Sequence, residues 1–216
     1  MSAASLAHAR HVLSGNPVTA LAFGLFALLV GTAIIGPELV PFDPIAAAGP
    51  ALQPPSARHP FGTDAIGRDV FSRVIAATRL DLGMAFAAVA IVFACGTLAG
   101  AAAGLFGGWT DRIVGRLADT IMAFPLFVLA MGIVAALGNT VTNIVIATAV
   151  VNFPLYVRIA RTEASTRRGA GYVEAARLSG YGEAHILFRE ILPNLLPIMM
   201  VQVSLTLGYA ILNCAG

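Results

Sequence analysis

Long stretches without charged residues are the feature that most restricts the fold of this chain. Five of them contain no Asp, Glu, Arg or His and are rich in Ala, Leu, Val and Ile. A helix rises 1.5 Å per residue, so about 20 such residues cross a hydrocarbon core of ~30 Å. The stretches are residues 18–36, 82–106, 121–137, 141–157 and 195–216. They predict an all-α, polytopic membrane helix bundle with five spans.

Composition supports the membrane class and excludes several functions. Only 11% of the 216 residues are charged and 58% are hydrophobic, whereas soluble domains have about 25% charged residues. A net charge of +2 gives no sign of nucleic-acid binding. All 13 basic residues are Arg, which excludes a P-loop and Schiff-base chemistry because both need a lysine. Nucleophile–base pairs and metal-ligand clusters are also missing from the sequence, so we expect no catalytic residues and no enzyme.

Arginine placement predicts the orientation of the spans. The leader 1–17 and the loops 107–120 and 158–192 together hold nine arginines, whereas the loop 37–80 holds four. The positive-inside rule places the arginine-rich side in the cytoplasm. We therefore expect a cytoplasmic N-terminus, a periplasmic loop at 37–80 and a membrane core at 81–216.

The 37–80 loop changes character along its length. It is first rich in Pro and Gly, which predicts turns. A helical stripe then predicts an amphipathic helix along the outer membrane surface, leading into the second span. Asp69 falls where a helix dipole favours an acid. His59 and Asp64 could serve a metal or catalytic role, but one His and one Asp in a turn are more typical of capping and turn formation. The stripe residues are Phe71, Val74, Ile75, Thr78 and Leu82.

The polar loop before the fifth span, at about 163–193, predicts two short helices joined at Gly180. Gly180 suits a helix C-terminal turn, and Pro193 is expected to end the second helix. That helix has an apolar stripe of Ala184, Leu187, Phe188 and Ile191. Periodicity alone leaves two alternatives open, an interfacial shield for the loop and a docking surface for a partner protein.

Small residues in the second span form the run "GTLAGAAAG" at 96–104. Such residues permit close helix packing in lipid, although the general alanine bias of the chain is an equally good explanation. The absence of ionisable residues from the spans argues against a secondary transporter. A membrane scaffold without transport function stays open on these grounds.

Three segments resemble permease subunits of bacterial ABC importers in the dipeptide/oligopeptide/nickel family. The stretch "EAARLSGYGEAHILFREILP" resembles the EAA loop and departs from it at Glu190. "HPFGTDAIGRDVFSRVIAATRLDLG" resembles the segment before the second span and departs at Ala77 and Asp81. "GGWTDRIVGRLADTIMAFP" resembles the next loop and departs at Gly115. The matched EAA positions are Glu174, Ala175, Ala176, Gly180, Leu192 and Pro193.

The resemblance implies a type I importer permease fold in the bacterial inner membrane. Its implied partners are a second homologous permease, two cytoplasmic ATPase subunits and a periplasmic substrate-binding protein. ATP and Mg would lie on the ATPase subunits, and this chain would hold no cofactor. Leu187 and the matched EAA positions would couple to the ATPase. The periplasmic family motif would be Gly62, Thr63, Asp64, Gly67, Arg68 and Asp69.

Substrate and length are further expectations from this resemblance. Short peptides are the expected substrate, with nickel or glutathione as alternatives. Six spans are usual for this subunit, so we expect that a sixth span is missing after residue 216.

Overall fold

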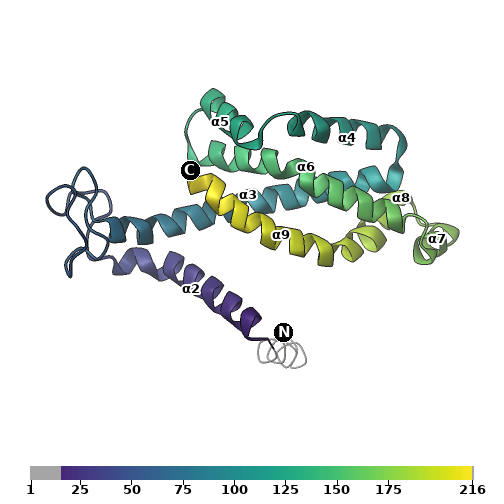
Figure 1. The fold of residues 1–216 in the computed structure, drawn as a ribbon. Coiled ribbons are helices and arrows are strands. Elements are labelled where there is room, and N and C mark those ends of the chain that lie inside the picture. The colour runs from purple at the N-terminus through teal and green to yellow at the C-terminus, as the bar shows by residue number, and fades with distance from the viewer. Residues whose placement is uncertain (1–15, 216) are drawn as a thin grey trace. The chain divides into compact units, whose positions relative to one another are not determined.

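The computed structural model describes residues 16–215, with side chains to residue 212. Its regular structure in this part of the chain is entirely helical (Figure 1). The chain forms two compact units, one ending at Leu82 and one starting at Gly83. Most of the expected leader 1–17 lies outside the described residues. The all-α membrane fold predicted from the sequence is confirmed.

The first unit begins with α2, Pro17–Leu39. The Asn16 side chain caps it by accepting hydrogen bonds from the N–H groups of Val18 and Thr19, and Pro17 suits the first helical position because its missing N–H would be unpaired there. Its 23 residues extend about 35 Å, enough to cross a bilayer. Gly36 lies against Ile75 of α3, where a Cβ would be 2.6 Å from the Ile75 side chain.

The helix α3, Val70–Phe106, is longer than expected from the sequence. Its 37 residues extend about 55 Å without a proline. The amphipathic segment and the second span are therefore one helix, and the described residues between α2 and α3 form no separate helix. Asp69 immediately precedes α3 and accepts a hydrogen bond from the Ser72 N–H at 2.8 Å, so it acts as the N-cap.

The expected third span is broken in the structure. The helix α4, Gly108–Met122, meets α5, Leu126–Leu137, at a bend of 92°. Pro125 precedes α5, and a proline removes a helical hydrogen bond and disfavours helical backbone at the residue before it. The 12 residues of α5 extend only about 18 Å. Four described helices are long and apolar enough to span, and a fifth span requires counting α4 and α5 together.

Close packing of α3 against α6, Val141–Arg167, depends on three glycines one turn apart. A Cβ on Gly96 would be 2.7 Å from the Tyr156 Cβ. A Cβ on Gly100 would be 2.9 Å from the Ala160 Cβ, and a Cβ on Gly104 would be 2.8 Å from the Ala164 Cβ. These distances are shorter than real carbon contacts, so only glycine permits this approach. The close-packing interpretation of the small-residue run is confirmed.

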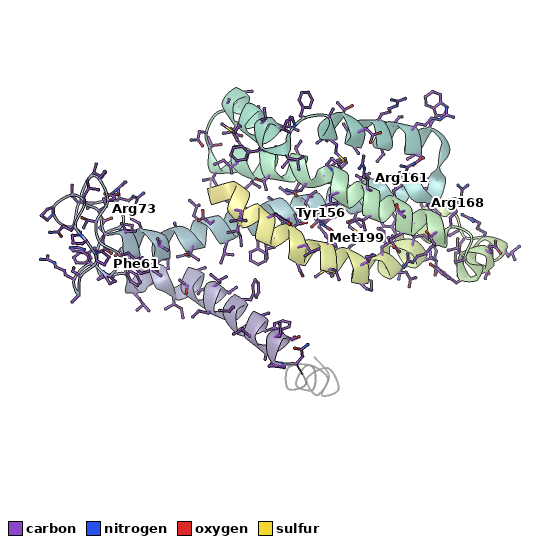
Figure 2. All side chains as sticks on the ribbon, viewed as in Figure 1. Phe61, Arg73, Tyr156, Arg161, Arg168 and Met199 are labelled. Carbon is purple, nitrogen blue, oxygen red and sulfur yellow. The ribbon has the colours of Figure 1, made fainter. Side chains whose placement is uncertain are left out.

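The main core joins α3, α6 and α9, Leu192–Ala215. Tyr156 of α6 and Met199 of α9 are both fully buried in it (Figure 2). A buried polar contact also lies in α9, where the Gln202 side-chain amide donates a hydrogen bond to Thr206 Oγ1 at 2.9 Å. The core continues down to the loop between α6 and α9, so that loop is anchored to the bundle.

Candidate functional site

The loop that follows α6 folds onto the end of the bundle through α7, Gly171–Leu178. Val173 is fully buried and Ala176 nearly so, and both belong to the main core with Ala160 and Ala164 of α6. The other side of α7 is exposed, including Glu174 and Ala175. The helix is therefore anchored by one face and leaves the other open.

Gly180 ends α7 in a Schellman turn. Its φ is +84°, its N–H donates to the Arg177 carbonyl at 2.9 Å, and the Tyr181 N–H donates to the Ala176 carbonyl at 3.1 Å. This pair of bonds satisfies carbonyls that the helix end leaves free. A Cβ at Gly180 would meet no atom within 4 Å. Backbone conformation alone, and not crowding, therefore requires glycine here, and the predicted turn is confirmed.

Arg177 connects the three helices that meet at this turn. Its guanidinium binds both carboxylate oxygens of Glu183, at 2.7 and 3.2 Å. It also donates to the backbone carbonyl of Arg168, the C-cap of α6, at 3.1 Å. The hydrogen bond to Glu183 raises the pKa of Arg177, and the same bond lowers the pKa of the Glu183 carboxyl. The turn is held in one arrangement by a charge-assisted, bidentate contact.

The second helix of the loop does not end at Pro193 as the sequence predicts. A short turn α8, Glu183–His185, continues through the π-helix η1, Ile186–Ile191, directly into α9. Pro193 is the second residue of α9, where hydrogen bonding returns from the π to the α pattern. A π turn disturbs the regular ladder of backbone hydrogen bonds, so a missing N–H is tolerated at this boundary.

The π turn also changes which side chains are buried. Leu187 and Ile191 are buried as predicted, but Ala184 and Phe188 of the expected stripe are exposed, and Ile186 is fully buried instead. Ile186 and Ile191 are five residues apart, the spacing of the i→i+5 hydrogen bonds that distinguish a π turn from an α-helix. The sequence analysis missed Ile186 because it assumed the α-helical period.

Several large apolar side chains remain exposed on this anchored loop. Leu178 is 90% exposed, and the Tyr181 ring stacks on His185 with ring centroids 4.3 Å apart. Exposed apolar side chains gathered in one segment are typical of an interaction site. We call the group the coupling surface, after the role that we propose for it, and its members are Tyr172, Leu178, Tyr181 and Phe188.

The remaining EAA-loop residues differ in their burial. Leu187 is buried, Leu192 packs against the core, and Pro193 is exposed. Leu187 therefore supports the chain's own fold and is not available to a partner. Arg177 and Glu183 were not singled out from the sequence, because their spacing of six residues is not a helical neighbour distance.

The predicted periplasmic motif forms a folded loop in the first unit. Gly62 and Gly67 have φ values of +74° and +79°, and a Cβ on either would overlap a backbone carbonyl, of Gln53 or Gly49 respectively. Thr63 Oγ1 donates to the Pro50 carbonyl at 2.7 Å. These three residues close the loop on itself.

Asp64 and Asp69 anchor this loop to the start of α3. Asp64 accepts the N–H groups of Ile66 and Arg68, each at 3.0 Å, and the guanidiniums of Arg68 and Arg73. Burial acts to raise the pKa of the Asp64 carboxyl, but the hydrogen bonds from Arg68 and Ile66 outweigh it and lower the pKa. The buried Asp69 pairs with His59 at 2.8 Å. Burial likewise opposes its bonds to Ser72 and His59, and its pKa is lowered.

The loop gives no support to a metal site. Among the described residues, no three His, Cys, Asp or Glu side chains gather where they could hold a metal ion. His59 pairs with Asp69 and not with Asp64, the residue suggested by the sequence. Capping and turn formation account for both acids.

Comparison with known proteins identifies the family. Residues 96–216 match the family described as binding-protein-dependent transport system inner membrane component. The chain belongs to this family. It is 40% identical to the probable D,D-dipeptide transport system permease protein of Escherichia coli K12, over 94% of the chain and 69% of that protein.

Two further relatives are named for different substrates. The chain is 37% identical to the nickel transport system permease protein of Escherichia coli K12, over 94% of the chain and 74% of the relative. It is 35% identical to the glutathione transport system permease protein of Pectobacterium atrosepticum, over 91% of the chain and 66% of the relative. The chain is thus a permease of a binding-protein-dependent ABC importer, and spans about two thirds of these relatives.

Proposed function

We propose that this permease imports short peptides and couples to cytoplasmic ATPase subunits through the loop 163–193. Exposure of the coupling surface on a loop that is otherwise fixed to the bundle is the observation that supports this proposal. A rigid loop with exposed apolar side chains can transmit a movement of its partner to α6 and α9. Family membership argues against the scaffold alternative.

The proposed complex contains two permeases, two ATPase subunits that carry ATP and Mg, and a periplasmic binding protein. This chain would hold no cofactor and perform no hydrolysis itself. Its N-terminus and the loop 163–193 would lie in the cytoplasm, and residues 37–80 in the periplasm of a bacterial inner membrane. The arginine distribution supports this orientation.

The coupling role is tested with Leu178→Asp, because Leu178 is exposed and its replacement should not disturb the core. We expect the variant to reach the membrane but to lose co-purification with the ATPase subunits, or to lose transport-linked ATP hydrolysis. Thr162→Asp, at an exposed position of α6 that precedes this loop, is the control. Normal coupling in Leu178→Asp would contradict the proposed surface.

The substrate is proposed from relatives whose names include dipeptides. Nickel and glutathione are the alternatives, because relatives named as nickel and glutathione permeases are about as similar to this chain in sequence. Uptake of a labelled dipeptide, of nickel and of glutathione by the reconstituted importer would separate the three. Peptide uptake that excess nickel does not inhibit is the expected result.

A further inference from the structure

The two faces of α4 differ in a way that the coupling role does not explain. One face packs on α6 around the buried Ala118. Asp111 pairs with Arg161 and Asp119 with Arg158, the latter at 3.0 Å. Figure 2 shows Arg161 on the side of α6 next to α4. Both acids of α4 are therefore used to hold it against α6.

The opposite face carries arginines without such partners. Trp109, Ile113 and Leu117 recur every four residues and are 75%, 64% and 52% exposed. Arg112 and Arg116 are exposed on the same face, and the Arg112 guanidinium lies 5.6 Å from the centroid of the Trp109 ring. Neither arginine forms an ion pair with a residue in the described part of the chain. We call these five residues the α4 outer face.

The position of α4 along α6 places this face near a membrane boundary. The apolar part of α6, residues 141–157, ends where Arg158 begins a segment with four arginines up to Arg168. The ion pairs from α4 reach Arg158 and Arg161, at the start of this polar segment. Trp and Arg side chains are enriched at this depth, where a ring or a stem is in apolar surroundings and a polar end is in water.

We propose that the α4 outer face binds anionic phospholipid headgroups of the adjacent leaflet. A helix with an apolar stripe and arginines on one face fits the interface plane of a bilayer. Guanidinium groups bind phosphate through paired hydrogen bonds, and two unpaired arginines favour a headgroup with net negative charge over a zwitterionic one. A protein partner on this face would have to supply two acids of its own. The proposal does not depend on the coupling surface or on the substrate.

Trp109 is the only tryptophan in the chain, so its fluorescence reports directly on this face. The test uses the full chain in nanodiscs of phosphatidylcholine and phosphatidylglycerol in equal amounts, with one lipid at a time brominated to quench tryptophan. We expect brominated phosphatidylglycerol to quench Trp109 more strongly than brominated phosphatidylcholine. Each arginine should contribute a preference of about five-fold, which corresponds to ~1 kcal/mol per basic residue near a charged surface.

The double variant Arg112→Gln, Arg116→Gln should reduce the preference to nearly one while quenching itself persists. Arg79→Gln, at an exposed arginine of α3 outside the α4 outer face, should leave it unchanged. Equal quenching by both lipids in the unaltered chain would overturn the proposal. Absence of quenching by either lipid would also overturn the proposal. In that case the water-soluble quencher acrylamide would show whether Trp109 faces water or is shielded by a second permease. The wild-type comparison decides the matter even if the double variant misfolds.

Discussion

Arg177 and Glu183 form a bidentate ion pair across the Gly180 turn, with contacts of 2.7 and 3.2 Å. The same guanidinium holds the Arg168 carbonyl at the end of α6. One side chain thus fixes the end of α6, the end of α7 and the start of α8 relative to one another. If this arrangement transmits movement from an ATPase, breaking the ion pair should impair the coupling of ATP hydrolysis to transport more than it lowers the stability of the fold.

The first prediction concerns Arg177→Gln. Both partners are partly exposed, and such pairs contribute only ~0–1 kcal/mol, so we expect little change in thermal stability. ATP hydrolysis per transported substrate should rise, because the turn no longer moves as one body. Hydrogen exchange of the Tyr181 N–H should also become faster. Arg189→Gln, at an exposed arginine of η1 for which no ion pair occurs in the described part of the chain, is the matched control.

The second prediction concerns Gly180→Ala. Its φ of +84° costs an L-residue about 1–2 kcal/mol, although the methyl group itself would meet no atom. We expect a lower melting temperature or a distorted turn, with poorer coupling. Gly180→Asn should be milder, because Asn tolerates this conformation.

Gly182→Ala supplies the control for this substitution two residues further on. Gly182 has a φ of −73° and open space around its Cβ position, so its replacement should be neutral. Equal effects of the alanine at 180 and at 182 would contradict the conformational explanation.

The third prediction concerns Gly100→Ala in the contact between α3 and α6. The new methyl group would meet the Ala160 Cβ and the Val157 carbonyl, so the helices must separate. Overpacking of this kind costs about 1–3 kcal/mol, and the melting temperature in detergent should fall. Gly83→Ala lies in the same helix with open space around it, and should be neutral or slightly stabilising.

Some of this arrangement could be predicted from the sequence. Uncharged stretches located the apolar helices because their length matches the bilayer, and Gly180 marked a turn because no other residue adopts its φ freely. The break at Pro125 was harder to predict, since prolines also occur inside helices here, as Pro154 in α6 and Pro197 in α9 do. Only packing of the neighbouring segments decides between a bend and a break.

The site could be predicted only in outline. The α-helical period identified Leu187 and Ile191 but not Ile186, because the wider π turn changes which side chains share the buried face. Arg177 and Glu183 meet because a turn reverses the chain between them, and a periodicity argument cannot detect such a pair. Phe188 shows the same limit, as it fits the apolar pattern but is 57% exposed.

The fourth prediction concerns the pH dependence of the loop that precedes α3. Folding lowers the pKa of the Asp64 and Asp69 carboxyls. Each therefore contributes stability that is fully present above the unfolded pKa of about 3.9, and that is lost as the pH falls further towards the folded value. Limited proteolysis of residues 40–69 should thus accelerate below about pH 4. The Asp69→Asn variant should be cleaved faster than the unaltered chain at neutral pH, and its cleavage rate should depend less on pH. Glu38→Gln is the control.

The last prediction concerns membrane topology. Single cysteines at Ala47 and Ser165, both exposed positions, would be placed in a chain lacking Cys95 and Cys214. An impermeant thiol reagent applied to intact spheroplasts should label Ala47→Cys only, because the arginine distribution places Ser165 inside. Permeabilised membranes should allow both to react. Labelling of Ser165→Cys alone in intact spheroplasts would reverse the orientation, and with it the assignment of the coupling surface to the cytoplasm.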